Sequence, residues 1–269
     1  MALNYMVKYV LNQRIIYRNE VLHFMIRFIA AILFIVIFLI VSIPIQLVLL
    51  IIKKSNPYAV KTASLKIVGF AFNTVMLICG IKVTVIGEEN VPKDRSVLYV
   101  GNHRSYFDIV VTYPRVPRPT GYISKDVIKK IPILGYWMIF LDCLFLDRSD
   151  IRKGLEMVLA AIEKVKSGIS MCIFPEGTRN STDAPMLDFH KGSFKIAQKS
   201  GCPIVPMVIN HSRDIFENHI PFIKPTHVVI EYCKPVVISE LDKEDQRNID
   251  SYVKNIIEET YIKNEKLPL

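Results

Sequence analysis

The sequence lacks the cysteine and histidine patterns that hold a structural metal ion. It has no Cys-x-x-Cys pair and no cluster of these residue types, so we expect no zinc site and no metal in the functional site. The five cysteines are odd in number and widely spaced, and most lie in apolar runs. Such residues are typical of buried, reduced thiols, and we expect the globular part of the chain to face a reducing compartment.

The sequence also lacks a recognisable nucleophile. No G-x-S-x-G segment is present, which excludes the strand-to-helix elbow that presents serine in α/β-hydrolases. No other serine or cysteine stands out, so we expect any group transfer to be direct and not through a covalent intermediate. Internal repeats, low-complexity linkers and recognised nucleic-acid-binding motifs are absent as well.

Charge and hydropathy indicate a membrane or another anionic partner. Hydrophobic residues make up 51% of the 269 residues, and the mean hydropathy of +0.30 is high for a soluble protein. The 34 lysine and arginine residues outnumber the 25 acidic residues, for a formal net charge of +9. This excess fits nucleic acid, anionic lipid or an anionic substrate. A nucleic-acid binder is the least favoured of these, because the charge accompanies a long apolar segment.

The first 80 residues predict two apolar helices. Residues 28–52 contain no charge, and this run exceeds the roughly 20 residues that span a bilayer core. Pro44 and Gln46 interrupt it and basic residues flank both ends, which favours a re-entrant or interfacial arrangement over a simple span. Asn56 and Pro57 form a typical start, and Gly80 a typical stop, for the second helix. We expect residues 1–80 to form a two-helix membrane-anchoring segment, although the second helix could instead be a core helix of the following domain.

From residue 81 on, short apolar runs alternate with helical patterns. Residues 81–269 are therefore expected to form a single α/β domain, with a mixed, largely parallel sheet flanked by helices. A helix in the tail from Ser239 onward is expected to be peripheral. The expected strands are residues 81–86, 96–100, 122–125, 144–146, 171–174, 203–207 and 226–232, and the clearest helices are residues 150–166 and 192–200.

Two polar turns follow apolar strands and contain the candidate site residues. The first contains His103 and Asp108, and a histidine oriented by a carboxylate can remove a proton from a hydroxyl. Residues five apart lie about 140° around a helix, so the pair can meet only if His103 is on the turn and Asp108 in the helix that follows. Ser105, between them, is expected to cap that helix and not to act as a nucleophile.

The second turn, residues 176–179, combines a carboxylate, a glycine, a hydroxyl and a guanidinium. Arginine beside glycine and threonine suits a phosphate group, because planar donors, a hydroxyl and the backbone can all approach it. A solvated turn with a surface Glu–Arg pair is the alternative. If the two strands are parallel, both turns meet at one edge of the sheet, where α/β folds usually bind ligands.

The two turns resemble signatures of the glycerolipid acyltransferase family. Residues 102–108 (NHRSYFD) match the NHxxxxD signature and residues 174–179 match the FPEGTR signature, in the family's order and spacing. Residues 145–148 and the Val205-Pro206 pair agree with two further blocks. Within the family, the chain is most similar to 1-acyl-sn-glycerol-3-phosphate acyltransferases, and the resemblance covers about residues 81–210.

The resemblance implies roles for the matched residues. His103 would be the general base on the free glycerol hydroxyl of the acceptor, and Asp108 would orient it. Arg179 would contact the acceptor's phosphate. Asp142 departs from the family's pattern, which usually has glycine there, so the match of residues 142–148 is weaker than that of the two turns. The residues implied for substrate binding are Glu176, Gly177, Thr178, Arg179, Lys125 and Arg148.

The function implied by the resemblance is acyl transfer at a membrane. The enzyme would move a fatty acyl group from acyl-CoA or acyl-carrier protein to the sn-2 hydroxyl of lysophosphatidic acid, making phosphatidic acid in phospholipid biosynthesis. No cofactor is expected, because a thioester already has a good leaving group with a thiol pKa of about 8.5. The expected partners are membrane lipid and the acyl donor but no nucleic acid, and the catalytic domain is expected on the cytoplasmic side.

Other functions remain open from the residues alone. One is an acyltransferase for another lysophospholipid or for glycerol phosphate. A second is a membrane lipid hydrolase that uses His103 and Asp108 on water, and a third is a non-catalytic, basic lipid-binding protein. The sequence leaves open the acyl donor, the chain-length preference and the oligomeric state.

Overall fold

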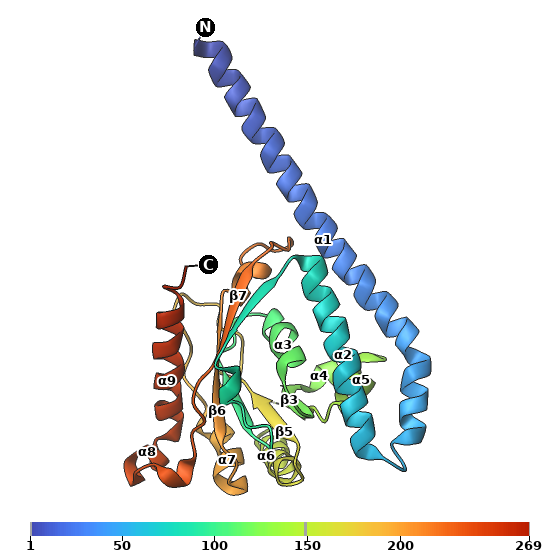
Figure 1. Cartoon of the computed structure of the whole chain (residues 1–269), viewed down its shortest axis with the longest axis vertical. Helices are drawn as coiled ribbons and strands as arrows, with labels where there is room; N and C mark the ends of the chain where they lie inside the picture. The colour runs from blue at the N-terminus through green and yellow to red at the C-terminus, as the bar shows by residue number, and fades with distance from the viewer. Residues whose placement is uncertain (1, 148–149, 269) are drawn as a thin grey trace.

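A helical hairpin and a seven-stranded sheet make up the fold (Figure 1). The computed structural model describes residues 2–147 and 150–268, with side chains from residue 21 onward apart from that of Ile151. The sheet order is β1-β7-β6-β2-β5-β3-β4, and all neighbouring strands are parallel except β6 and β7. The predicted mixed, largely parallel sheet is therefore confirmed. The strands are β1 (Lys82–Ile86), β2 (Leu98–Gly101), β3 (Thr120–Lys125), β4 (Leu144–Leu146), β5 (Ser170–Ile173), β6 (Ile204–Asn210) and β7 (His227–Tyr232).

Helices cover both faces of the sheet and create two hydrophobic cores. Successive residues of a strand point to opposite faces, so Tyr99 of β2 joins one core while Leu98 and Val100 join the other. The short helices α4 (Asp126–Lys129) and α8 (Lys243–Arg247) add single turns. The first core contains residues of α2 (Pro57–Cys79), α3 (Phe107–Thr112) and α5 (Leu134–Phe140), and the second those of α6 (Ile151–Lys166), α7 (Lys195–Ser200) and α9 (Ile249–Asn264).

The carboxyl-terminal helix α9 is part of the second core, so the expectation that the tail is peripheral was wrong. Val253 and Ile257 are completely buried, and α9 packs against β6 (Figure 1). One buried stripe, with a spacing of four residues from Ile249 to Tyr261, faces the sheet, and most of the other residues of the helix are polar. That narrow stripe made the helix resemble a surface helix in the sequence.

The amino-terminal hairpin consists of α1 (Ala2–Ile52) and α2. The start and stop of α2 are as predicted: the Asn56 side chain accepts a hydrogen bond from the Ala59 amide at 3.0 Å, and Gly80 ends the helix with a φ of 71°. Helix α1 is longer than its apolar run and extends through the basic residues before it. Arg27 of α1 donates to the carbonyl of Ile78 at 3.1 Å, which joins the two helices near the end of α2.

The few polar residues in the apolar part of α1 face the protein. Ser42 and Gln46 are both buried. The Ser42 hydroxyl accepts from the indole of Trp137 at 3.0 Å, and the Gln46 amide donates to the carbonyl of Ile133 at 3.0 Å. Pro44 lies inside the helix, which changes direction towards its carboxyl end (Figure 1). Directional bonds thus fix the apolar helix onto α5.

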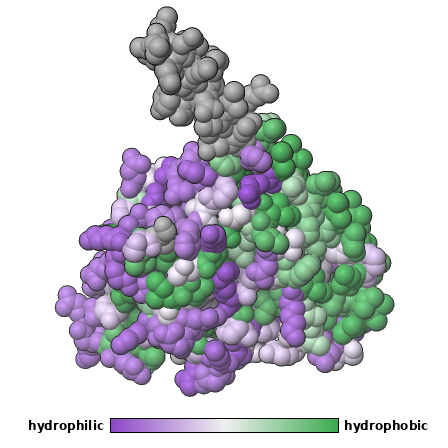
Figure 2. All heavy atoms as spheres, turned by 45° about the horizontal axis from the view of Figure 1, so that its top comes forward, coloured by the Kyte–Doolittle hydropathy of each residue, from purple (hydrophilic) through white to green (hydrophobic). Residues whose placement is uncertain are grey.

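Much of the remaining hairpin surface is apolar. Segments Val21–Ile52 and Pro57–Cys79 are long and apolar enough to cross a membrane. Apolar residues gather on the side of the molecule where this hairpin lies (Figure 2), and Ile51 of α1 is 72% exposed. Helix α2 has two roles, because Val60 and Val75 are buried in the first core while Leu77 is exposed. The boundary at residue 80 therefore marks a change in sequence composition and not a gap in packing.

Candidate active site

The carboxyl ends of four neighbouring strands gather the predicted site residues at one edge of the sheet. Strands β2, β5, β3 and β4 are parallel neighbours and end at residues 101, 173, 125 and 146. His103 follows β2, Arg179 lies in the turn after β5, and Lys125 ends β3. This confirms the predicted meeting of the two polar turns. Arg148, predicted to contact phosphate, lies outside the described residues.

His103 and Asp108 are in direct contact. The imidazole Nδ1 lies 2.8 Å from Oδ2 of Asp108, whose side chain is completely buried. Asp108 is the second residue of α3 and His103 is on the preceding turn, which is the arrangement that their spacing required. The same Oδ2 accepts hydrogen bonds from the backbone amides of Arg104 and Ser105, each at 2.8 Å. The carboxylate therefore shapes the turn as well as holding the histidine.

The surroundings of the His103 ring set its orientation. The ring stacks on Phe174 with a centroid distance of 4.3 Å and an interplanar angle of 15°. A carboxylate oxygen only accepts, so in the neutral ring Nδ1 carries the proton shared with Asp108 and Nε2 keeps its lone pair. Ser105 lies just before α3, and its hydroxyl accepts from the amide of Phe107, the first residue of that helix, at 3.0 Å. The side chain of His103 is 18% exposed, so a substrate can reach the ring.

The turn after β5 depends on a glycine. Gly177 has a φ of 69°, in the left-handed region, and a Cβ there would come within 3.0 Å of the ring of His190. The amide of Gly177 donates to the carbonyl of Phe174 at 3.0 Å and closes the turn. Thr178 is exposed at the tip, where its hydroxyl is open to a ligand.

Glu176 connects the turn after β5 to the turn that carries His103. Its side chain is buried, and its carboxylate accepts from the backbone amides of His103 at 2.6 Å and Leu187 at 2.8 Å. Burial raises the pKa of this carboxyl above its ordinary value, and the two amide donors oppose that rise. Both carboxylate oxygens bind backbone amides of the protein, so Glu176 has a structural role in this fold. Its expected contact with the acceptor stays a prediction.

Arg179 is held in a fixed position beside the histidine turn. Its Nη1 lies 3.2 Å from a carboxylate oxygen of Glu217, and its guanidinium carbon lies 3.5 Å from the centre of the Tyr106 ring. The Arg179 side chain is 33% exposed. Lys125 is exposed at the end of β3, next to β5 in the sheet. Cationic groups thus lie on two neighbouring strand ends of the same edge.

Asp142, the residue that departs from the family's pattern, has a structural explanation. Its φ is 57°, so it keeps the left-handed backbone conformation that glycine favours. Its carboxylate lies 2.9 Å from Lys61 of α2 and 2.5 Å from Lys164 of α6. The substitution therefore adds an ion-paired link from the hairpin to a helix on the other face of the sheet, just before β4.

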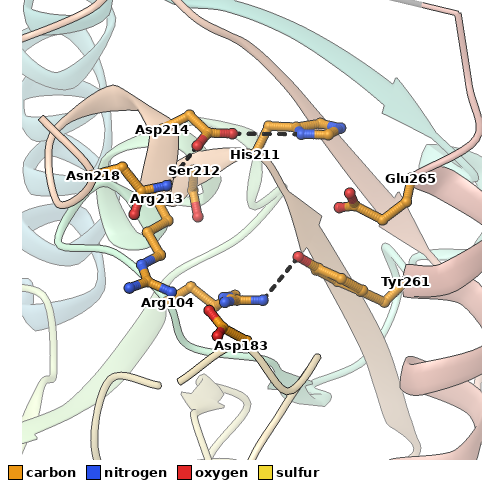
Figure 3. A pocket seen from close by; sticks show the side chains of 9 residues that line it. All are labelled: Arg104, Asp183, His211, Ser212, Arg213, Asp214, Asn218, Tyr261 and Glu265. Carbon is orange, nitrogen blue, oxygen red and sulfur yellow. Dashed lines mark hydrogen bonds and ion pairs between the residues drawn. The ribbon is translucent and has the colours of Figure 1, made fainter. Parts of the chain in front are cut away.

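A separate polar pocket lies beside the histidine turn, at the end of β6 (Figure 3). It has a volume of about 310 Å³ and includes a second His–Asp pair, with His211 Nδ1 3.7 Å from Asp214. The nearby Asp214 carboxylate, which acts as an acceptor for the His211 ring, raises the pKa of His211 above its ordinary value. None of the predicted site residues that the structure describes lines this pocket, which is formed by Arg104, Asp183, His211, Ser212, Arg213, Asp214, Asn218, Tyr261 and Glu265.

Sequence reasoning missed Glu217 entirely. It lies in the loop after β6, 38 residues from Arg179, within a segment that has no strand or helix pattern of its own. Only the folded arrangement brings it to the strand ends. A largely parallel α/β sheet carries a buried carboxylate–histidine pair and an anchored guanidinium at one edge, and this combination is chemically suited to removing a proton next to an anion.

Comparisons with known proteins agree with this chemistry. The family model described as Acyltransferase matches residues 82–210. A 1-acyl-sn-glycerol-3-phosphate acyltransferase of Borreliella burgdorferi is 30% identical over 180 residues, which cover 67% of this chain and 72% of that protein. One of Saccharomyces cerevisiae is 30% identical over 175 residues, covering 64% of this chain and 57% of that protein.

A solved structure shares the fold. The crystal structure of the 1-acyl-sn-glycerophosphate (LPA) acyltransferase PlsC from Thermotoga maritima matches with a TM-score of 0.65 at 24% identity, and the match covers 85% of this chain and 99% of that chain. The chain belongs to the acyltransferase family and is an enzyme of that class. The match to the family model ends at residue 210, so Glu217 and α9 lie beyond it.

Proposed function

We propose that this enzyme transfers a fatty acyl group from acyl-CoA or acyl-carrier protein to the sn-2 hydroxyl of lysophosphatidic acid, forming phosphatidic acid in phospholipid biosynthesis. The observation that carries this proposal is the 2.8 Å contact of His103 with buried Asp108, at the sheet edge that also holds Arg179. A base and a phosphate anchor on adjacent turns suit an acceptor that has a hydroxyl close to a phosphate. The names of the relatives support the same acceptor.

His103 is the general base in this proposal. Its Nε2 takes the proton of the acceptor hydroxyl as the oxygen attacks the thioester carbonyl. The C–O bond forms and the C–S bond breaks, and the departing thiolate takes up a proton from the imidazolium. Asp108 keeps Nδ1 protonated and stabilises the imidazolium while it exists. No further cofactor or metal takes part in this proposed mechanism.

Arg179 holds the acceptor's phosphate, because a guanidinium can donate two parallel hydrogen bonds to phosphate oxygens. Lys125 and Arg148 contribute further positive charge, and Gly177 and Thr178 let the backbone and a hydroxyl approach the ligand. Glu176 keeps the two turns in register.

The membrane is the source of the acceptor in this proposal. The apolar hairpin lies in lipid, as its exposed surface and its two long apolar helices suggest (Figure 2). We propose that the catalytic domain is on the cytoplasmic side, where its buried thiols stay reduced. Protease digestion of sealed membrane vesicles of known orientation tests this. The protease should cut the domain only in vesicles whose membrane has its cytoplasmic side facing outward.

Acyl transfer by the purified full chain in lipid vesicles tests the function. Radiolabelled acyl-CoA or acyl-carrier protein is offered with lysophosphatidic acid, lysophosphatidylcholine or glycerol 3-phosphate, and free thiol is measured in parallel. We expect labelled phosphatidic acid, together with thiol release that depends on lysophosphatidic acid. Thiol release without any acceptor would show a hydrolase, and a preference for another acceptor would assign that acceptor instead.

A further inference from the structure

Glu217 connects the two turns of the candidate active site. One carboxylate oxygen accepts from the Ser105 hydroxyl at 2.7 Å, and the other accepts from the Tyr106 amide at 2.8 Å. The second oxygen also lies 3.2 Å from Nη1 of Arg179. The Glu217 side chain is only 11% exposed. A single carboxylate therefore joins the turn that carries His103 to the turn that carries the predicted phosphate anchor.

The contact with Glu217 leaves part of the Arg179 guanidinium available. Glu217 engages Nη1, and the Tyr106 ring supports the face of the group at 3.5 Å. No other hydrogen bond or ion pair of Arg179 occurs among the residues that the structure describes. The Nε and Nη2 donors are thus free to bind two oxygens of one phosphate. Because these contacts already fix the plane of the Arg179 guanidinium, phosphate binding need not immobilise a flexible side chain.

The loop that carries Glu217 is anchored on the hairpin. Phe216, its neighbour, stacks on Phe28 of α1 with a centroid distance of 5.8 Å and an interplanar angle of 10°. Phe216 also packs against the first core. The position of the Glu217 carboxylate is therefore set by the packing of the neighbouring Phe216 as well as by the donors that it binds.

We propose that Glu217 is a positioning residue that sets where Arg179 lies relative to His103. It thereby fixes the distance at which the enzyme holds an acceptor's phosphate from the base that acts on its hydroxyl. The inference rests on the proposed function, since it assumes that Arg179 binds the phosphate of the acceptor. It adds a residue outside the family-matched segment to the substrate-recognition machinery.

Kinetics of Glu217→Gln test the proposal. The variant keeps a hydrogen-bonding group of the same size but removes the charge that holds Arg179. We expect kcat/KM for lysophosphatidic acid to fall about tenfold, mainly through KM, which corresponds to about 1.4 kcal/mol. The KM of the acyl donor should stay within about twofold. Glu231→Gln is the matched control, because Glu231 is 14% exposed and pairs with Lys263 at 2.7 Å, and it should behave like the wild type.

A double-mutant cycle tests whether Glu217 acts through Arg179 or stabilises the site as a whole. In an Arg179→Ala background, Glu217→Gln should cause no further loss in acceptor kcat/KM. Equal losses in both backgrounds, or an equal rise in the donor KM, would overturn the proposal. If Glu217→Gln does not fold, Glu217→Asp, which keeps the charge but shortens the reach, replaces it with the same expected coupling. A wild-type enzyme inactive on every lysolipid would refute the proposed function instead.

Discussion

Replacing Asp108 by asparagine tests the acid–base pair with the least change in shape. In the wild type, one oxygen accepts from the His103 imidazole and from two backbone amides, all at 2.8 Å. An asparagine oxygen can still accept from the amides, so the turn should persist. The hydrogen bond from the imidazole loses its charged acceptor, and the imidazolium that forms in the proposed proton transfer loses its counter-charge.

The expected effect on rate follows from these two losses. A hydrogen bond to a charged group contributes about 1.5–3 kcal/mol and a neutral one about 0.5–1.5 kcal/mol. Serine proteases, in which an aspartate likewise orients a histidine, lose about 10⁴ in kcat on the same substitution. We expect Asp108→Asn to lower kcat by about 10²–10⁴ with little change in the acceptor KM, because the proposed phosphate anchor, Arg179, lies on the other turn.

Acyl transfer with saturating donor measures the change, and circular dichroism checks that the variant is folded. Asp214→Asn is the matched control, because Asp214 also contacts a histidine, His211, but in the separate polar pocket. That variant should keep wild-type activity. If Asp108→Asn is folded and retains more than about a tenth of the wild-type kcat, His103 does not act as a base oriented by Asp108.

Three further predictions concern the backbone, a titrating pair and a thiol. Gly177→Ala should lower the unfolding free energy by about 1–2 kcal/mol, because alanine is strained at a φ of 69° and its Cβ meets His190; chemical denaturation measures this. Asp214 raises the pKa of His211 in the folded state, so the pair stabilises the fold fully below the unfolded pKa of about 6.5. This stabilisation is lost as the pH rises through the higher folded pKa. The unfolding free energy of the wild type should therefore exceed that of Asp214→Asn by more at about pH 5.5 than at about pH 8. Burial raises the pKa of Cys143 to about 12, so iodoacetamide at about pH 8 should not modify it before unfolding, which mass spectrometry checks.

The parts of the fold that local sequence determines were predictable. Strands β2 and β5 are short apolar runs, and each is followed at once by residues that cannot continue a buried strand. This pattern located the turns of His103 and Arg179 and implied that both lie at one edge. Asn56 and Gly80 delimit α2 through contacts within a few residues, so they too could be read from the sequence.

Features that depend on distant residues were not predictable in the same way. Glu217 approaches Arg179 only because β6 lies next to β2 and the following loop turns back over the strand ends. The position of α9 depends on which sheet face is left uncovered, and its own polar surface conceals that. Asp142 showed only as a departure from a pattern, because its two lysine partners come from α2 and α6.

If the hairpin lies in lipid as proposed, its packing gives the candidate active site a fixed place relative to the membrane. Helix α2 contacts α3, which carries Asp108, and α1 supports Phe216 next to Glu217. The proposed base and the proposed phosphate anchor therefore connect to the apolar helices through packed contacts and not through a flexible linker. A single-chain lysolipid keeps its acyl chain in the bilayer while its hydroxyl and phosphate stay within a few bonds of each other. Because the hairpin would be held at a constant depth by its apolar surface, the rigid connection would keep His103 and Arg179 at the level of that headgroup, and the acceptor would not have to leave the membrane to react.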